Sequence, residues 1–151
     1  METKQALKKL QQICSRQEKC AADVIVLLKK WGIGQEEHQK ILERLMTERF
    51  IDEVRYAEAF VRDKIRFDHW GTKKIRYFLR HKGIDKTVCD KAIGSFDRDE
   101  YRSLIGKELA KKRKALKGSS REIWAKLARY GSSRGYEMEI MRDFLGDNAG
   151  D

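Results

Sequence analysis

An internal repeat is the feature that most narrows what this chain of 151 residues can fold into. Gly32, Gly83 and Gly131 lie 51 and 48 residues apart, in the segments Lys-Trp-Gly-Ile, His-Lys-Gly-Ile and Arg-Tyr-Gly. Aliphatic residues stand eight and four positions before each glycine, namely Val24 and Leu28, Ile75 and Leu79, and Ile123 and Leu127. Because self-similarity at a fixed period is the signature of a repeat protein, the spacing predicts three related units of about fifty residues.

Helices are the predicted building element of each unit. The chain contains no proline, so no residue interrupts a helix by lacking an N–H group. Apolar residues recur at steps of three and four, as in Val54, Ala57, Val61 and Ile65, which is the spacing of one helix face. We therefore predict an all-α fold. The expected helices are 3–18, 21–31 and 35–49, then 53–69, 72–82 and 86–94, then 98–117, 120–130 and 134–146.

The ends of these helices follow from turn and capping residues. Each repeat glycine is expected to end the second helix of its unit, because glycine adopts the left-handed conformation without a Cβ clash. Asp52 and Asp85 are the expected caps of the helices that follow them, and Ser119 with Glu122 fits a capping box. In the first unit the repeat register places the start of the second helix near Cys20.

Stacking of the units is expected because each is marginal alone. The predicted repeats span residues 1–51, 52–96 and 97–151, the last with a short tail. A three-helix unit of this size buries too small a fraction of its surface to offset the ordering entropy comfortably. We predict an elongated, curved array of three tandem three-helix repeats with a concave side. Leu28, Leu79 and Leu127 are expected to lie buried between helices.

Composition indicates a water-soluble protein. Lys and Arg number 34 against 24 Asp and Glu, which gives a net charge of +10, and the mean hydropathy is −0.72. No apolar run approaches the roughly 18 residues that span a bilayer, and the opening residues lack the apolar stretch of a signal peptide. We expect a cytoplasmic protein with no membrane contact. The three cysteines form no C-x-x-C pair and are expected to be packing residues in a reducing compartment.

Sequence motifs of catalysis and cofactor binding are absent. The chain has no G-x-x-x-x-G-K-[ST] phosphate loop, no G-x-G-x-x-G, no H-E-x-x-H and no nucleophile elbow. His38, His69 and His81 are spaced too irregularly for a standard metal-ligand set. We expect no enzyme activity, no cofactor and no metal.

Basic residues are the candidate functional groups. They fall in three helical rows: Arg55, Arg62 and Arg66; Lys73, Lys74, Arg76, Arg80 and Lys82; and Lys107, Lys111 and Lys114. Each row is either a solvated helix face or part of a groove that meets phosphates or an acidic protein surface. Trp70, Tyr77 and Trp124 lie among these residues, where such side chains either stack on bases or a partner or pack between helices.

The central stretch resembles the RecX family of bacterial regulatory proteins. The resemblance rests on residues 50–62, Phe-Ile-Asp-Glu-Val-Arg-Tyr-Ala-Glu-Ala-Phe-Val-Arg, and on residues 70–84, which run from Trp-Gly-Thr-Lys-Lys to Lys-Gly-Ile. It implies an all-helical array of three-helix repeats, no catalysis, and binding in the deep groove of the RecA–DNA filament that lowers ATPase and strand exchange. Two positions depart from the pattern. Cys20 replaces a capping serine, and if Gly135 is the counterpart of the family's third glycine, the register shifts by four and that helix ends later.

Three functions therefore remain open at this stage. The first is a monomeric modulator of the RecA recombinase filament that uses its basic faces on acidic protein surfaces and on single- or double-stranded DNA. The second is a basic helical module that binds DNA or RNA by itself, and the third is a helical scaffold unrelated to nucleic acid. Composition does not separate them, because the same basic residues support the first two equally.

Overall fold

The described part of the chain, residues 1–146 of a computed structural model, is built from nine α-helices and no strands. The last five residues of the predicted tail lie outside the described residues. The helices are α1 (Thr3–Arg16), α2 (Ala21–Lys30), α3 (Gln35–Thr47), α4 (Glu53–Arg66), α5 (Thr72–His81), α6 (Lys86–Gly94), α7 (Arg98–Lys114), α8 (Ser120–Arg134) and α9 (Met138–Leu145). The predicted all-α class is confirmed.

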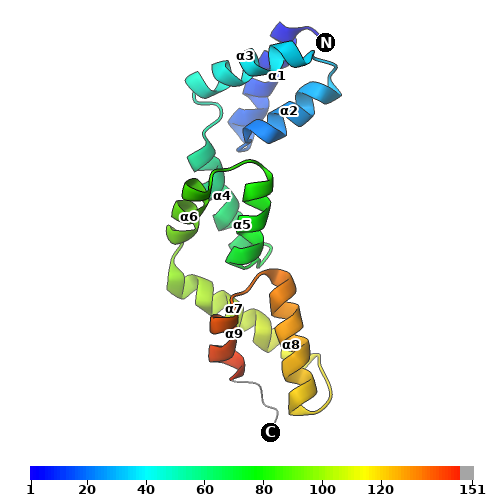
Figure 1. Cartoon of the computed structure of the whole chain (residues 1–151), viewed down its shortest axis with the longest axis vertical. Helices are drawn as coiled ribbons and strands as arrows, with labels where there is room; N and C mark the ends of the chain where they lie inside the picture. The colour runs from blue at the N-terminus through cyan, green and yellow to red at the C-terminus, as the bar shows by residue number, and fades with distance from the viewer. Residues whose placement is uncertain (147–151) are drawn as a thin grey trace.

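The helices form three groups that follow one another along an elongated array (Figure 1). We call α1–α3 repeat 1, α4–α6 repeat 2 and α7–α9 repeat 3. Helices α2, α5 and α8 line one side of the array (Figure 1). The limits drawn at residues 51 and 96 stay a prediction.

The hydrophobic core is divided unequally among the repeats. One cluster belongs to repeat 1 and includes Leu10, Leu28 and Leu45. A second, continuous cluster runs through repeats 2 and 3 and includes Leu79 and Leu127. Leu28, Leu79 and Leu127 are each 0% exposed, which confirms their predicted burial.

Two of the three repeat glycines end their helices as predicted. Gly32 and Gly83 follow α2 and α5 in the left-handed region, at φ of 74° and 81°. The prediction for Gly131 was wrong, because α8 continues through it to Arg134 and the left-handed residue is Gly135, at φ of 91°. The third helix of repeat 3 accordingly begins at Met138 rather than at residue 134.

The hydrogen bonds that close each turn show which residues of the three repeats are equivalent. The N–H of Ile84, just after Gly83, donates to the carbonyl of Leu79 at 3.0 Å, and Ile33 donates in the same way to Leu28. In repeat 3 the N–H of Tyr136 donates to the carbonyl of Gly131 at 2.9 Å. Gly131 is therefore the counterpart of Leu28 and Leu79. The sequence comparison had given that place to Leu127, four residues earlier.

Position 131 requires glycine because the side chain of Met141 occupies the space that a larger residue would need. A Cβ atom added to Gly131 would lie 2.1 Å from the Sδ atom of Met141 in α9. The thioether of Met141 thus fills the volume that Leu28 and Leu79 fill in the other repeats, and flexible Met side chains suit such gaps. Glycine at this position permits close helix packing rather than a turn.

Most helix starts follow the predicted capping. Asp52 accepts a hydrogen bond from the N–H of Arg55 at 3.0 Å, and Ser119 with Glu122 forms the expected capping box. Cys20 precedes α2 as the repeat register predicts. Asp85 stands at the start of α6 without a side-chain capping bond. The first helix of each repeat ends two or three residues earlier than expected, at residues 16, 66 and 114.

Backbone hydrogen bonds join repeat 2 to repeat 3. The N–H of Gly71 donates to the carbonyl of Arg134 at 2.7 Å, and the N–H of Lys73 donates to the carbonyl of Gly135 at 3.1 Å. The carbonyl end of α8 therefore faces the N–H end of α5, which satisfies polar groups that a helix leaves unpaired and aligns the two helix dipoles. A Cβ on Gly71 would lie 2.2 Å from the carbonyl oxygen of Gly135, so this approach requires glycine.

Two tyrosines strengthen the same junction. The hydroxyl of Tyr101 in α7 accepts a bond from the N–H of Thr72 at 3.0 Å and donates to the carboxylate of Glu137. The hydroxyl of Tyr136 donates to the carbonyl of His69 at 2.7 Å. Both tyrosines are buried, and burial is the main reason why their pKa values are raised.

Side chains, by contrast, join repeat 1 to repeat 2. Cys20, at the start of α2, is buried in the core cluster of repeats 2 and 3. The carboxylate of Asp23 pairs with the ammonium of Lys82, and the carboxylate of Glu18 pairs with the guanidinium of Arg55. No pair of helices drawn one from each of these two repeats makes more than a weak contact within the described residues.

Candidate interaction surface

The eleven basic residues predicted to bind a partner fall into two sets. Five make hydrogen bonds within the protein and are called the paired set: Arg55, Arg66, Arg76, Arg80 and Lys82. The side chains of the other six make no hydrogen bond to another described residue, and these residues are called the open set: Arg62, Lys73, Lys74, Lys107, Lys111 and Lys114. The predicted rows are therefore not uniform, because each row of repeat 2 mixes both sets.

Arg55 is the most heavily used member of the paired set. Its Nε donates to Glu18 Oε2 at 2.5 Å, and its Nη2 donates to the carbonyls of Arg49 and Phe50 at 3.1 and 3.3 Å. The bond to Glu18 is the main reason why the pKa of Arg55 is raised. Arg55 thus fixes the segment that connects the first two repeats.

Lys82 caps the carboxyl end of α5, and its side chain reaches back to repeat 1. Its ammonium pairs with Asp23, whose other carboxylate oxygen accepts the N–H of Cys20 at 3.2 Å. Burial opposes ionisation of Asp23, but the bonds from Lys82 and Cys20 outweigh it and leave the pKa of Asp23 below its usual value. Asp23 therefore caps the start of α2, and Lys82 of the next repeat holds the Asp23 carboxylate in place.

The other paired residues support repeat 2 and its link to repeat 3. Arg66 forms a two-bond pair with Glu100 of α7, at 2.8 and 3.1 Å. Arg76 donates to Asp90 of α6 at 3.3 Å. The guanidinium of Arg80 donates to the carbonyl of Ile84 at 3.0 Å, across the turn that follows its own helix.

The open set is concentrated on α5 and α7. Lys73, Lys107, Lys111 and Lys114 are exposed. Lys74 is half-buried, with its Nζ 4.4 Å from the centre of the Trp70 ring. Arg62 is exposed, and its nearest carboxylate, that of Asp63, is 3.9 Å away. These six cations are available to an anionic partner without loss of a hydrogen bond inside the protein.

Sequence reasoning missed basic residues on α8. Arg121, Lys126 and Arg129 are exposed on α8, which packs beside α7. Lys112 and Arg113 are also exposed, next to the predicted Lys111 and Lys114. The net positive charge of the predicted third repeat indicated this region. The individual basic residues of α8 can be selected only once it is known which face of the helix is buried.

Aromatic rings form a connected group on repeat 2. Trp70 lies 6.2 Å from Phe60 and 5.0 Å from Phe78, and Tyr77 lies 5.5 Å from Phe78. Tyr77 is 56% exposed and Phe78 39%, whereas Trp70 is half-buried. Lys64 and Lys74 place their ammonium groups 4.7 and 4.4 Å from the Trp70 ring. Trp124 instead donates to the carbonyl of Gly146 at 3.1 Å.

Two histidines, His38 and His81, and the three cysteines occupy ordinary packing positions. His38 is buried, with its Nε2 3.0 Å from the carbonyl of Ile33, and His81 stacks against Tyr77 at 4.2 Å between ring centres. All three cysteines are buried, and burial is the main reason why the pKa values of their thiols are raised. Among the described residues, no three His, Cys, Asp or Glu side chains are grouped to hold a metal ion, and none of the helices has the length and apolarity to cross a membrane.

Family models match two of the three repeats. Residues 52–93 match the model described as the second three-helix domain of RecX, and residues 99–145 match the third. The chain belongs to the RecX family. The match covers repeats 2 and 3, the part of the chain that shares one continuous core.

Relatives named regulatory protein RecX extend the likeness into repeat 1. The protein from Prosthecochloris aestuarii is 31% identical over 118 residues, which are 78% of this chain and 76% of that protein. The protein from Clostridium tetani is 29% identical over 117 residues, which are 76% of this chain and 53% of that protein. The matched part of this chain thus spans about half the length of the clostridial RecX and three quarters of the other.

Solved RecX structures share the fold over almost the whole chain. A crystal structure of regulatory protein RecX superimposes with a TM-score of 0.84 at 25% identity, over 95% of this chain and 72% of that one. The RecX of Lactobacillus salivarius gives a TM-score of 0.76 at 20% identity, over 94% of this chain and 93% of that one. The fold of this chain is therefore shared with both of these RecX structures.

Proposed function

We propose that this chain is a regulator of the RecA recombinase that binds in the groove of the RecA–DNA filament and lowers its ATPase and strand-exchange activities. The protein acts as a cytoplasmic monomer without catalysis of its own, and the ATP is hydrolysed by its partner. The observation that carries the proposal is membership of the RecX family, whose members matched here are named regulatory proteins.

The shape and charge of the molecule support a filament partner. An elongated array presents several contacts along an extended surface, whereas a compact domain presents one patch. The open set supplies cations on two repeats that carboxylates of RecA or phosphates of DNA can take up. We assign the larger share of partner contact to the open set and a smaller share to the paired set, whose charges already serve the fold.

Charge reversal on α7 tests this assignment. Lys107→Glu combined with Lys111→Glu changes two exposed residues one helical turn apart, so helical content and melting temperature should stay unchanged. Affinity for a preformed RecA–single-stranded DNA filament, measured by fluorescence anisotropy of the labelled chain, should fall about tenfold because two attractive contacts become repulsive.

A matched control separates this site from total charge. Lys4→Glu combined with Lys8→Glu makes the same change in net charge at the same spacing on α1, on exposed residues of repeat 1. The control should lose much less affinity than the α7 variant. If both double variants bind as the parent does, the partner surface does not include the α7 row, and if both lose affinity equally, only total charge matters.

A second candidate function is nucleic-acid binding without RecA. The observation that favours it is the aromatic group of repeat 2, in which exposed Tyr77 and Phe78 adjoin Trp70 and two lysines. Exposed rings beside cations are the elements on which bases of single strands stack. Tyr77→Ala should then weaken binding to a single-stranded oligonucleotide.

Binding at two salt concentrations distinguishes the two candidates. The chain is titrated with single-stranded DNA with and without RecA and nucleotide. Binding to free DNA that falls steeply with salt and gains nothing from RecA would favour the stand-alone module. Binding that requires RecA supports the filament regulator. If the chain binds in neither titration, the remaining candidate is a helical scaffold unrelated to nucleic acid.

A further inference from the structure

We propose that the junction between repeats 1 and 2 is a hinge closed by two ion pairs, Glu18–Arg55 and Asp23–Lys82, and that repeat 1 moves on it as a rigid unit. These two pairs are called the latch. The hinge follows from how the repeats are joined, and it does not depend on the identity of the partner.

Separate cores allow repeat 1 to move as a unit. The core cluster of repeat 1 contains its own residues and the connecting Ile51, whereas repeats 2 and 3 share one cluster. Repeat 1 contributes two small side chains to the neighbouring core, buried Cys20 and partly buried Ala22. Relative movement of repeats 1 and 2 therefore exposes little apolar surface, which keeps the opening cost low.

The latch supplies the attraction that closes the junction. The bond from Arg55 Nε to Glu18 spans 37 residues of sequence, and the bond from Lys82 to Asp23 spans 59. Each pair is partly exposed, with side-chain exposures of 42% and 27% in the first and 36% and 18% in the second. Ion pairs in contact with water are weakened by added salt.

Unpaired carboxylate oxygens in the closed junction favour opening. Oε1 of Glu18 and Oε2 of Glu53 are buried without a hydrogen-bond partner. The charge of Glu53 is also disfavoured by burial and by the nearby Asp23 and Asp52, which raise its pKa. A hollow of about 480 Å³ lies beside the latch, lined by both repeats. Water can reach these carboxylates when the junction opens.

Opening changes which cations a partner can reach. Arg55 and Lys82 are the two cations of the latch, and both belong to the paired set. In the closed state their hydrogen bonds go to repeat 1 and to the connecting segment. In the open state both cations lose their carboxylate partners on repeat 1, and Arg55 keeps only its bonds to the connecting segment.

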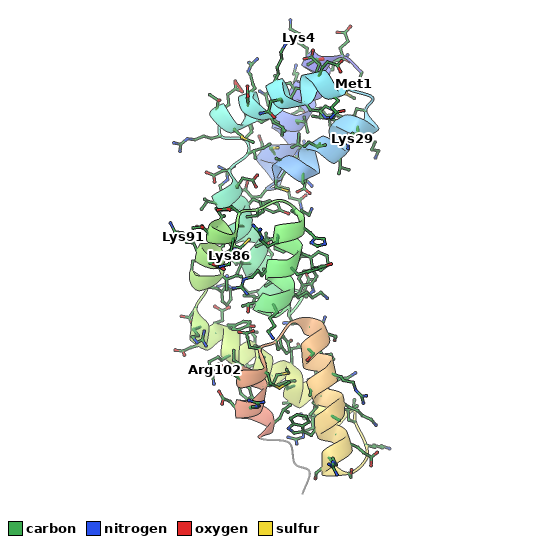
Figure 2. The ribbon with its side chains drawn as sticks, in the orientation of Figure 1. Met1, Lys4, Lys29, Lys86, Lys91 and Arg102 are labelled. Atoms are coloured by element: carbon green, nitrogen blue, oxygen red, sulfur yellow. The ribbon has the colours of Figure 1, made fainter. Side chains whose placement is uncertain are left out.

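Distance measurements between spin labels test the hinge on the full chain. Lys29→Cys on repeat 1 and Lys91→Cys on repeat 2 place labels across the junction, on exposed residues marked in Figure 2. Lys91→Cys with Arg121→Cys places labels across the junction of repeats 2 and 3. The three native thiols are buried, and the chain without introduced cysteines serves as the labelling blank.

The hinge predicts that only the first label pair responds to salt. Between about 0.05 and 1 M salt, the width of its distance distribution should grow about twofold, while the second pair stays narrow. Glu18→Gln with Asp23→Asn should broaden the first pair already at low salt. Asp90→Asn, which removes an ion pair inside repeat 2, should not.

The salt series on the chain with an unchanged latch still tests the hinge if a latch variant fails to fold. Because the salt series leaves both ion pairs in place, it stands without the substitutions. Equal widths for the two label pairs at high salt would overturn the hinge. A double latch variant that folds, as judged by helical content, and keeps a narrow first distribution would overturn the role of the ion pairs.

Discussion

The two junctions between repeats use the same arrangement of helices and different chemistry. At each one the start of a second helix approaches the end of the second helix that follows it along the array, α2 with α5 and α5 with α8 (Figure 1). Between repeats 2 and 3, main-chain N–H groups of α5 donate directly to carbonyls at the end of α8. Between repeats 1 and 2, Asp23 caps α2, and Lys82, the residue after α5, binds Asp23.

Residue size at the start of the helix explains the difference. Gly71 precedes α5 and lets the main chain of repeat 3 come within hydrogen-bonding distance. Cys20 stands at the equivalent place before α2, and its side chain fills the gap as part of the neighbouring core. The presence or absence of a side chain at this position thus decides whether the main chains of two repeats come within hydrogen-bonding distance. We expect the main-chain junction to be the more stable of the two.

Gly71→Ala should produce the largest loss. The added Cβ would lie 2.2 Å from the main-chain oxygen of Gly135, which cannot rotate away, so the junction must separate. We expect a loss of about 3 kcal/mol in the free energy of unfolding, measured with urea. Gly94→Ala is the control, because its added Cβ meets nothing within 4 Å. If both variants are equally stable, the close approach at Gly71 is not required.

Removal of one hydroxyl at each junction should have the next largest effect. Tyr101→Phe leaves the N–H of Thr72 without an acceptor and Glu137 without a donor, and should cost about 1 to 2 kcal/mol in unfolding free energy. Tyr56, four residues after the cap Asp52, occupies the same place in α4 as Tyr101 does after Asp97. Tyr56→Phe should cost less, because its hydroxyl makes no comparable pair of bonds. Equal losses would contradict the contrast between the junctions.

Neutralising the latch should cost little stability. Glu18→Gln or Asp23→Asn should each lower the unfolding free energy by less than about 1 kcal/mol, because both ion pairs are partly exposed. The pKa of Asp23 is depressed in the folded state, so its contribution is present at neutral pH and is lost as pH falls through that depressed value. Urea titrations at two salt concentrations and at acidic pH measure the effect. A loss above about 2 kcal/mol would identify the pairs as structural rather than as a latch.

Glu53→Gln should have the smallest effect, and it should be stabilising. The pKa of Glu53 is raised in the folded state, so its charge destabilises the protein above that pKa and ceases to do so once the carboxyl is protonated. The variant should therefore be more stable than the parent at pH 7 and equal to it below about pH 4. Thermal unfolding at the two pH values checks both parts. Destabilisation at pH 7 would mean that the carboxylate has a partner.

Local signals explain how much of the fold the sequence predicts. The steps of three and four and the absence of proline identify every helix, because those properties act within one helix. Gly32 and Gly83 mark turns because their neighbours also match. Gly131 leads the sequence-based prediction astray because its role depends on Met141 of α9. The side chain of Met141 fills the space that a side chain at position 131 would occupy. A compensation of this kind between helices leaves no mark in one repeat alone.

The candidate surface is less predictable because charge pairing is a tertiary property. The sequence places the basic residues on helix faces, but their carboxylate partners lie far away in the chain. The carboxylate partner lies 14 residues away in the sequence for Arg76, 34 residues away for Arg66 and 59 residues away for Lys82. No periodicity within a helix reveals such pairs. Only the fold separates the paired set from the open set.

The most direct test of the functional account is the DNA-dependent ATPase activity of the RecA recombinase from the same organism. Steady-state hydrolysis is measured on single-stranded DNA while the intact chain is added, with Lys107→Glu combined with Lys111→Glu in parallel and the Lys4→Glu, Lys8→Glu control beside it. The account predicts that hydrolysis falls as the intact chain and the control are added, and falls much less with the α7 variant. A rate that stays constant up to saturating amounts of the intact chain would contradict it.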